Sequence, residues 1–138
     1  MIDASTEFGA RAARRLHEER LAWLTTVGAD GTPTPVLVWF LWDGDESFLL
    51  YSRPDTPKLR NIARNSRVSL HLDGDGSGGN AVVVTGAARV SEDPPAHRVP
   101  EYVAKYGWGF ERNRWTPEEF AEMYSVPIRI RMLRLRGH

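Results

Sequence analysis

The sequence predicts a mainly β fold with peripheral helices (α+β): a six-stranded antiparallel barrel in a single domain that spans residues 1–138. Six segments are rich in β-branched and aromatic residues and are bounded by Gly, Pro or Asp, as is typical of strands. The links between them favour hairpins over crossovers, so an antiparallel barrel is the expected arrangement. We expect the strands at residues 21–27, 35–42, 47–52, 68–72, 81–90 and 127–136.

The chain is expected to begin with an amphipathic helix. A pair of hydroxyl residues at positions 5–6 can cap a helix that reaches about Glu19. Apolar side chains recur four residues apart on one face of this segment, at Phe8, Ala12 and Leu16. The first strand then follows and ends in the turn-forming sequence Gly-Ala-Asp-Gly-Thr-Pro.

The second strand is unusual because it is apolar at every position after Pro35. A strand of this kind is expected to be buried on both faces, so something other than its own sheet must cover the second face. The turn at residues 43–46 contains two Asp, a Gly and a Glu. It returns the chain along residues 47–52 as the other half of a hairpin.

The middle of the chain is expected to contain a short helix and two strands. Thr56 followed by Pro57 is a strong helix start, and the helix should continue to Asn65. A flexible glycine-rich loop at 73–79 separates the next two strands. The last strand alternates cleanly to Met132 and then slips phase, which predicts a β-bulge.

Two more helices are expected before the last strand. The prolines at 94–95 should open one that reaches about Tyr106. The second should run from Thr116 to about Tyr124, because Glu119 completes a capping box. Between them, the aromatic and charged segment 107–115 is expected to be a loop that either caps a site or merely packs.

Composition excludes several classes of function. The chain has no cysteine, so disulfides, thiolate nucleophiles and cysteine-ligated metals are ruled out. Its 18 basic and 18 acidic residues give zero net charge, so no general attraction draws it to nucleic acid or anionic membranes. With short apolar runs and no signal-peptide pattern, we expect a cytoplasmic protein.

No metal site and no catalytic residue are predicted. The four histidines lack metal-ligand spacing. The paired acidic residues at 118–119 lie at a helix start, where the helix dipole explains them. The sequence contains neither a P-loop nor a Gly-x-Gly-x-x-Gly motif.

The most informative segment, 51–62, has the features of an anion site. A strand end delivers Ser52 and Arg53, and a rigid turn leads to a helix whose first turn carries Lys58. A helix N-terminus offers free N–H groups and a positive dipole end, which suits a phosphate. The alternative is a solvated helix start with incidental basic residues.

Several motifs together resemble the pyridoxamine-5′-phosphate-oxidase-like split β-barrel superfamily, in particular its branch that uses the deazaflavin coenzyme F420. The resemblance covers nearly the whole chain, and the order and spacing of the motifs carry it rather than any single one. The motifs are Trp23-Leu-Thr-Thr, Pro35-Val-Leu-Val-Trp-Phe, Tyr51-Ser-Arg with Lys58-Leu-Arg-Asn-Ile, Val83-Val-Thr-Gly-Ala-Ala, Tyr102-Val-Ala-Lys-Tyr and Tyr124-Ser-Val-Pro-Ile-Arg.

The resemblance implies an FMN-binding-like homodimer with two identical cofactor sites at the interface. A ring system and the partner subunit would then cover the second face of strand 35–42. By position, the family's phosphate contacts fall on Ser52, Arg53 and Lys58, with Asn61 nearby. The residues that would line the ring of the cofactor are Val36, Val38 and Trp39.

Three further residues lie where some members of the family contribute interface or substrate-side groups: Tyr102, Lys105 and Tyr106. Trp108 is a fourth candidate to reach the site from the partner subunit. The alternative for Tyr102 and Tyr106 is a place in the core, because their spacing is helical. Lys105 is equally consistent with a surface position.

The function expected from the resemblance is that of an F420-binding oxidoreductase, which transfers hydride between the coenzyme and a small organic substrate. The cofactor would supply the chemistry, whereas the protein would position the cofactor and set its electrostatic environment. One alternative is an FMN-binding oxidoreductase of the same fold, and another is a non-catalytic flavin- or haem-binding protein. The neutral charge disfavours an oligonucleotide-binding barrel. The substrate and the direction of transfer do not follow from the sequence.

Overall fold

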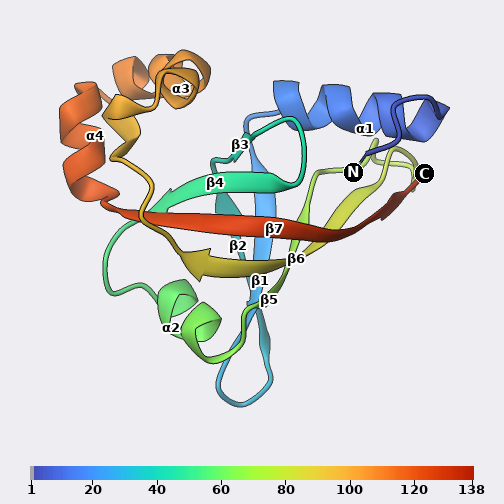
Figure 1. Ribbon diagram of the computed structural model, residues 1–138, viewed down its shortest axis with the longest axis horizontal. Coiled ribbons are helices and arrows are strands. Elements are labelled where there is room, and N and C mark those ends of the chain that lie inside the picture. Colours follow the sequence, from blue (N-terminus) through green and yellow to red (C-terminus); the bar gives the residue numbers. More distant parts are fainter. Residues whose placement is uncertain (1) are drawn as a thin grey trace.

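The computed structural model describes residues 2–138 as a seven-stranded sheet with four α-helices and one 3₁₀ turn (Figure 1). No helix in this part of the chain is long and apolar enough to cross a membrane. In chain order the elements are α1 (Glu7–Glu18), β1 (Ala22–Val27), β2 (Pro33–Val38), β3 (Leu41–Trp42), β4 (Ser47–Ser52), α2 (Pro57–Arg64), β5 (Arg67–His71), β6 (Val82–Val90), η1 (Ala96–Arg98), α3 (Pro100–Arg112), α4 (Pro117–Met123) and β7 (Val126–Gly137).

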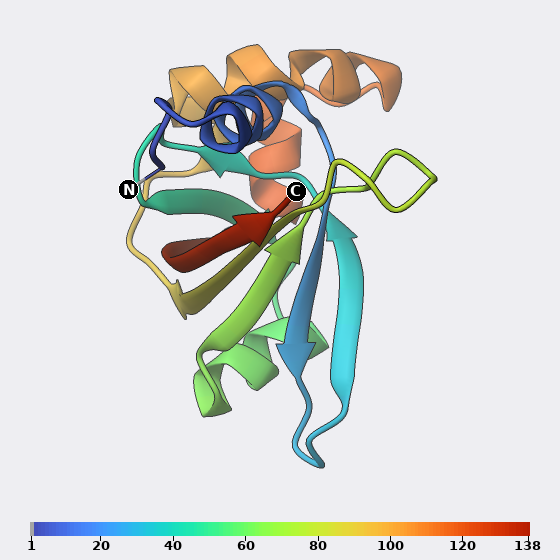
Figure 2. The same ribbon diagram turned by 90° about the vertical axis from the view of Figure 1, so that its right-hand side faces the viewer.

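The sheet is an antiparallel half-barrel. Its strand order is β2-β1-β5-β6-β7-β4-β3, and every neighbouring pair is antiparallel. The outermost strands β2 and β3 are consecutive in the chain, separated only by Trp39 and Phe40. Three residue steps reach at most about 11 Å. The sheet must therefore curl until its two ends come close, as Figures 1 and 2 show.

The prediction of one continuous strand at 35–42, and hence of six strands, is wrong. The chain breaks at residues 39–40, which gives β2 and β3 and a total of seven strands in the described residues. The break lets the same apolar run serve both edges of the sheet. Phe40 is fully buried in the barrel, whereas the Trp39 ring packs against α3 and α4.

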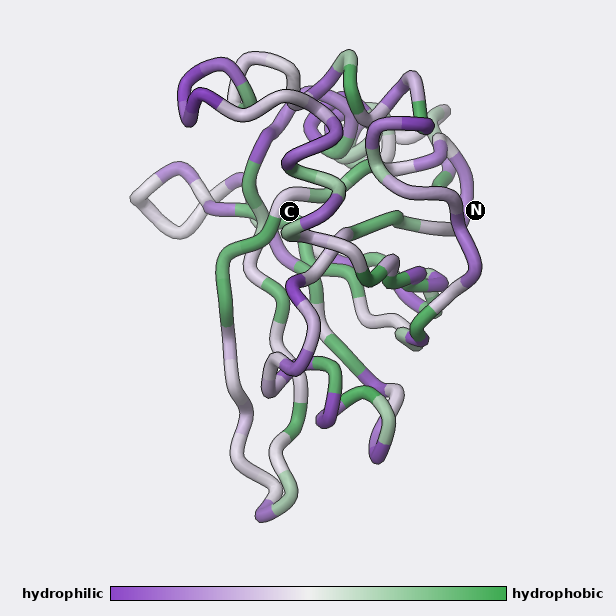
Figure 3. The backbone as a smooth tube through the Cα atoms, turned by 90° about the vertical axis from the view of Figure 1, so that its left-hand side faces the viewer, coloured by the Kyte–Doolittle hydropathy of each residue, from purple (hydrophilic) through white to green (hydrophobic). Residues whose placement is uncertain are grey.

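The expected burial of this segment on both faces is also wrong for the single chain. Val36 is 39% exposed and Leu37 is 51% exposed. The reason is topological, because β2 is an edge strand that pairs only with β1. In Figure 3 the β1–β2 hairpin reaches away from the rest of the molecule, and hydrophobic colouring runs along the upper part of β2.

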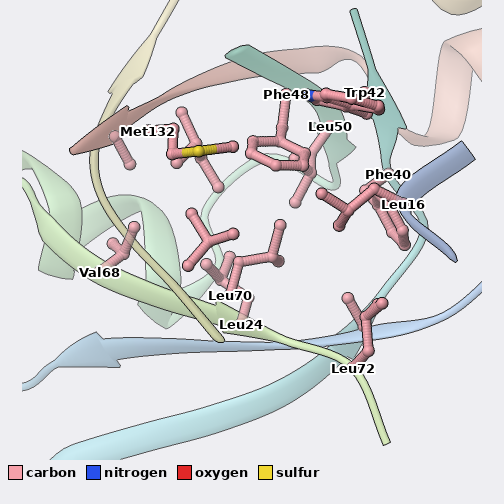
Figure 4. Packing of buried hydrophobic residues seen from close by; sticks show 14 of the residues in the cluster. Leu16, Leu24, Phe40, Trp42, Phe48, Leu50, Val68, Leu70, Leu72 and Met132 are labelled. Atoms are coloured by element: carbon pink, nitrogen blue, oxygen red, sulfur yellow. The ribbon is translucent and has the colours of Figure 1, made fainter. Parts of the chain in front are cut away.

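The main core fills the inside of the half-barrel (Figure 4). Alternate residues of the strands point inward, as the two-residue period of a strand requires. The N-terminal helix α1 adds Ala12 and Leu16 and so covers one end of the barrel. Strand residues that are at most 2% exposed include Leu24, Phe48, Leu70, Val84 and Ile130.

A second core lies on the outer face of β4, between that strand and the helices η1, α3 and α4. The helix expected from residues 94–95 to 106 instead begins at Pro100, after a 3₁₀ turn, and continues to Arg112. Most of segment 107–115, which was expected to be a loop, is therefore helical. Burial of Tyr102, Tyr106 and Phe110 outweighs the low helix propensity of the two glycines in this stretch.

Gly109 illustrates why this helix contains glycine. A Cβ at this position would lie 2.6 Å from the Trp39 ring, so only glycine allows the helix and the tryptophan to pack so closely.

Two local predictions are confirmed. Thr116 and Glu119 form both hydrogen bonds of the capping box. The register between β6 and β7 shifts between Thr85 and Gly86, which skips one residue directly after Met132.

The break at residues 39–40 is held by α3. The Tyr106 hydroxyl accepts a hydrogen bond from the Phe40 N–H at 2.8 Å. It also lies 2.7 Å from the carbonyl oxygen of Arg20 and 2.9 Å from that of Phe40, either of which can take its proton. Lys105 donates to the same Phe40 carbonyl at 2.9 Å. These bonds satisfy backbone groups that neither β2 nor β3 pairs.

Replacing Tyr106 by phenylalanine tests this clamp. Tyr106→Phe leaves the buried Phe40 N–H without its acceptor, so we expect a loss of about 1–3 kcal/mol in the free energy of unfolding. Urea denaturation followed by tryptophan fluorescence measures it. The matched control is Tyr124→Phe, because Tyr124 is partly exposed and its hydroxyl has no hydrogen-bond partner among the described residues. Equal effects of the two substitutions would contradict the clamp.

Candidate functional site

A cavity of about 260 Å³ lies where β2, β4, α2 and the helices α3 and α4 meet. Three of the seven predicted cofactor residues line it, namely Val38, Trp39 and Lys58. The walls are predominantly aromatic. Those aromatic residues are Trp39, Tyr51, Tyr102, Trp115, Phe120 and Tyr124.

Helix α2 presents Lys58 to this cavity. Thr56 precedes the helix but makes no side-chain capping bond, and Pro57 occupies its first turn. The Lys58 ammonium forms no ion pair or hydrogen bond with the described residues, and burial lowers its pKa. A charged group that is partly desolvated and unpaired gains most from a neighbouring anion. The start of α2 therefore fits a phosphate or carboxylate.

Ser52 and Arg53 form the turn that leads into α2. The buried Ser52 hydroxyl donates to the Arg53 carbonyl at 2.8 Å and lies 3.1 Å from the Thr56 hydroxyl. Its hydrogen bonds thus fix the path of the turn. The Arg53 guanidinium lies over the Tyr124 ring, 4.8 Å from its centroid, and its side chain is exposed. The guanidinium also donates to the Met123 sulfur at 4.0 Å, so it can reach a bound anion only by exchanging these exposed contacts.

Asn61 is committed to the structure of the barrel. Its amide nitrogen donates to the hydroxyls of Thr26 and Thr34, at 3.0 and 3.1 Å. Its amide oxygen accepts from Arg64 at 2.9 Å. These bonds tie α2 to the β1–β2 hairpin, so Asn61 orients the helix that carries Lys58.

The three predicted ring-lining residues lie at the exposed edge and at the break. Val36 is an exposed residue of the edge strand, and Val38 is partly buried against the main core. The Trp39 ring stacks on Tyr106, with centroids 4.6 Å apart, and on Phe120 at 5.5 Å. Trp39 thus joins the sheet edge to the aromatic cluster of α3 and α4.

The four residues considered for the substrate side have distinct environments. Tyr102 and Tyr106 are fully buried, which confirms the alternative that placed them in the core, although Tyr102 also lines the cavity. Lys105 is half-buried with its ammonium 4.0 Å from the centroid of the Phe40 ring. Trp108 lies within α3, and the Arg20 guanidinium covers its ring at 3.9 Å.

Sequence reasoning did not assign several cavity residues. Phe120 lies on α4 and Tyr124 directly follows that helix, whereas Tyr51 lies on β4, about 70 residues earlier, so no local pattern joins it to the other two. The one usable indication is the density of aromatic residues around segment 107–124. Among the described residues, no group of three or more His, Cys, Asp or Glu is placed to hold a metal ion.

The arrangement suits a flat molecule with an anionic end. Aromatic walls offer large apolar contact area to a planar ring. A cation at an uncapped helix start offers charge-assisted hydrogen bonds to a phosphate or carboxylate. Among the described residues that line the cavity there is no His, Ser, Thr, Asp or Glu.

Comparison of the chain with known proteins finds a matching family. A family model described as pyridoxamine 5′-phosphate oxidase matches residues 8–126. No curated protein matches the sequence.

The solved structures that share this fold are described as proteins of different kinds. A conserved hypothetical protein from Mycobacterium tuberculosis is 29% identical, with a TM-score of 0.72 over 95% of this chain and 82% of that one. An F420 reductase is 24% identical, with a TM-score of 0.64 over 91% of this chain and 96% of that one. The haem storage protein HutZ from Vibrio cholerae is 16% identical, with a TM-score of 0.62 over 90% of each chain. The likeness to the last two is one of fold.

The environment of Lys105 predicts an unusually acidic ammonium. Burial is the main cause and lowers its pKa from the ordinary 10.5 to about 8, against a smaller opposing effect of Glu19. The folded state should therefore release this proton at lower pH than the unfolded state, so stability rises as pH rises from about 8.

An NMR titration that follows the lysine ¹³Cε or ¹⁵Nζ signals measures this pKa directly. The signal that is lost in Lys105→Arg belongs to Lys105. We expect a midpoint near pH 8 for Lys105. A midpoint of 10 or above would show that the ammonium is as well solvated as in a free peptide and would contradict the burial argument.

Proposed function

Because the chain belongs to the pyridoxamine 5′-phosphate oxidase family, we propose that it is an oxidoreductase that binds a flavin-type cofactor with a phosphate group. We propose F420 as this cofactor, with FMN as the alternative, and a small organic molecule as the partner in hydride transfer. The single observation that carries the proposal is Lys58. It is a partly desolvated cation, unpaired among the residues that the structure describes, at the uncapped start of α2 beside an aromatic cavity.

The residues present fit such a cofactor. Lys58 and Arg53 would bind the phosphate, while Ser52 and Asn61 hold the turn and the helix in place. Val36, Val38 and Trp39 would contact the ring and orient it. When bound, the cofactor supplies the hydride chemistry. The aromatic side chains of α3 and α4 would exclude water from that ring on one side.

The preference for F420 over FMN rests on the order and spacing of the sequence motifs. The F420 reductase of the same fold is consistent with it. Both cofactors carry a ribityl phosphate, so the start of α2 does not distinguish them.

A haem-binding function, suggested by the fold of HutZ, has less support in this chain. Haem iron is commonly held by a histidine. None of the histidines lines the cavity, and His17 packs on the Trp42 ring with centroids 4.5 Å apart. We therefore favour a flavin-type cofactor.

We also propose that the chain forms a homodimer with its cofactor sites at the interface. Leu21 and Leu37 are 48% and 51% exposed beside the cavity, and Val36 is 39% exposed on the same strand. A second copy packed here would bury this apolar surface. Sedimentation velocity at micromolar concentration tests the proposal. We expect a dimer that Leu37→Glu converts to monomer, and a monomeric parent protein would contradict it.

Titration of the purified protein with F420 and with FMN tests the cofactor. Tryptophan fluorescence should report binding, because Trp39 and Trp115 line the cavity. We expect micromolar or tighter binding of F420 and much weaker binding of FMN. The reverse order would establish the FMN alternative, and binding of neither would refute a flavin-type cofactor.

The Lys58→Ala variant tests the phosphate assignment in the same titration. Loss of one charge-assisted hydrogen bond costs about 1.5–3 kcal/mol, so the affinity should fall at least tenfold without loss of fold. Arg60→Ala is the matched control, because Arg60 is an exposed cation on the same helix that hydrogen-bonds the Asp55 carbonyl. The affinity of the Arg60→Ala variant for the cofactor should be nearly unchanged. Equal losses of cofactor affinity in both variants would show that Lys58 contributes only a general positive charge, which would contradict a direct contact with the phosphate.

A further inference from the structure

A second cavity, of about 510 Å³, lies against strands β4, β6 and β7. Small-molecule sites usually measure about 300–1,000 Å³, so it has room for a ligand. In Figure 1 these three strands run side by side across the molecule, with no helix drawn over their middle. Among the described residues, none lines both this cavity and the aromatic one that contains Lys58. The residues that line the second cavity are Glu46, Ser47, Ser66, Ala87, Ala88, Arg89, Arg129 and Arg131.

The register of the sheet places arginines around the short side chain of Ala87. Arg67 on β5 and Arg131 on β7 are its two cross-strand partners. Arg89 lies two residues further along β6, about 7 Å away on the same face. The residues adjacent to these on each strand belong to the main core, so all three arginines point away from it. A methyl group thus lies between three long cationic side chains.

A fourth arginine, Arg129, is held in place by its own partners. Its guanidinium donates to both carboxylate oxygens of Asp93, at 2.9 and 2.8 Å, and to the Ser47 hydroxyl at 2.9 Å. The hydrogen bonds from Arg129 lower the pKa of Asp93 below its ordinary value. Arg129 is directly opposite Arg89 in the register, where two like charges are unfavourable, and Asp93 offsets that cost.

The other three arginines are exposed and free of such contacts in the described structure. Within residues 2–138 the side chains of Arg67, Arg89 and Arg131 form no ion pair and no hydrogen bond. Arg89 influences Asp93 through space, but the two oxygens of that carboxylate are already bonded. One acid, Glu46, lines the cavity and forms no ion pair with the residues that the structure describes. The face therefore has an excess of positive charge, which a bound anion would relieve.

The arrangement of these donors selects the kind of anion. Guanidinium groups bind both carboxylates and phosphates through paired N–H donors. A carboxylate offers two oxygens in one plane, whereas a phosphate monoester offers three around the phosphorus atom. The donors here come from separate strands around the small side chain of Ala87, so they can approach a ligand from several sides. That geometry suits a phosphate monoester better than a carboxylate.

We propose that this cavity is a second anion site, which binds a small molecule with a phosphate monoester group. Arg89 and Arg131 contact the phosphate, while Arg129, which Asp93 fixes in place, forms the wall beside them. The carboxylate of Glu46 opposes binding, because it lines the same cavity. The site is independent of the proposed cofactor, whose phosphate is assigned to the start of α2.

Isothermal titration calorimetry with glycerol 3-phosphate tests the proposal. This probe carries a monoester but no ring that would suit the aromatic cavity. Low ionic strength is needed, because salt screens exposed charges. We expect Arg89→Gln and Arg131→Gln each to lower the affinity about tenfold, the effect of losing one hydrogen bond between charged groups. Both variants should keep the thermal midpoint of the parent protein, because neither side chain has a partner to lose within the described residues.

Glu46→Gln should have an effect of the opposite sign. It removes the carboxylate that lines the cavity, so the affinity for glycerol 3-phosphate should rise. A general loss of structure would instead lower the affinity in every variant. Malonate, a small dicarboxylate, should bind more weakly than glycerol 3-phosphate, because it lacks a group with three oxygens around one centre.

Arg14→Gln is the matched control variant. Arg14 is an exposed cation on α1 and does not line the cavity, so its loss changes the net charge equally without altering the site. The affinity of this variant for glycerol 3-phosphate should be unchanged. The titrations are repeated in the Lys58→Ala background, which lacks the lysine of the other phosphate position. The effects of Arg89→Gln and Arg131→Gln should be the same there.

Four results would overturn the proposal: no binding of glycerol 3-phosphate by the parent protein, an equal loss of affinity in Arg14→Gln and Arg131→Gln, equal affinities for malonate and the ester, or the disappearance of all binding in Lys58→Ala. The last result would assign the probe to the start of α2. Binding that survives Lys58→Ala and depends on Arg89 and Arg131 would support the site even in a protein that binds neither F420 nor FMN.

Discussion

The architecture depends on one constraint: two residues must carry the chain from one edge of the sheet to the other. Trp39 and Phe40 do so, and their backbone cannot pair with either strand. The hydroxyl of Tyr106 satisfies the Phe40 N–H, and Lys105 bonds the Phe40 carbonyl. Helix α3 therefore has two tasks, because it covers the outer face of β4 and also holds the curl of the barrel closed.

The same break creates the site. Since Phe40 turns into the barrel, its neighbour Trp39 turns out against α3 and α4, where Gly109 leaves room for its ring. The cavity forms beside Trp39, and α2 brings Lys58 to its other side. The two lysines of the chain consequently differ in a simple way. Lys105 has a carbonyl partner and supports the fold, whereas Lys58 has no partner among residues 2–138 and is available to a ligand.

The chain carries apparent defects where a ligand or a second copy would lie. Leu37 is an exposed leucine on an edge strand. Within the described part of the chain, Lys58 is a partly desolvated cation without a counter-charge, and the buried Tyr102 hydroxyl has no acceptor. Each is unfavourable in the isolated chain, and all three belong to residues that line the same cavity. Local departures from good packing and pairing are expected at functional sites.

Features that depend on neighbouring residues could be predicted from the chain alone: the strand segments other than 35–42, the capping box at Thr116, the bulge after Met132 and the helix start that carries Lys58. Alternation and capping act over a few residues, so a single chain segment contains all the information. The break in strand 35–42, the helical state of segment 107–112 and the meeting of Tyr102 with the cavity were decided by tertiary structure alone. There the burial of aromatic rings from distant elements and the closure of the sheet outweighed local propensity.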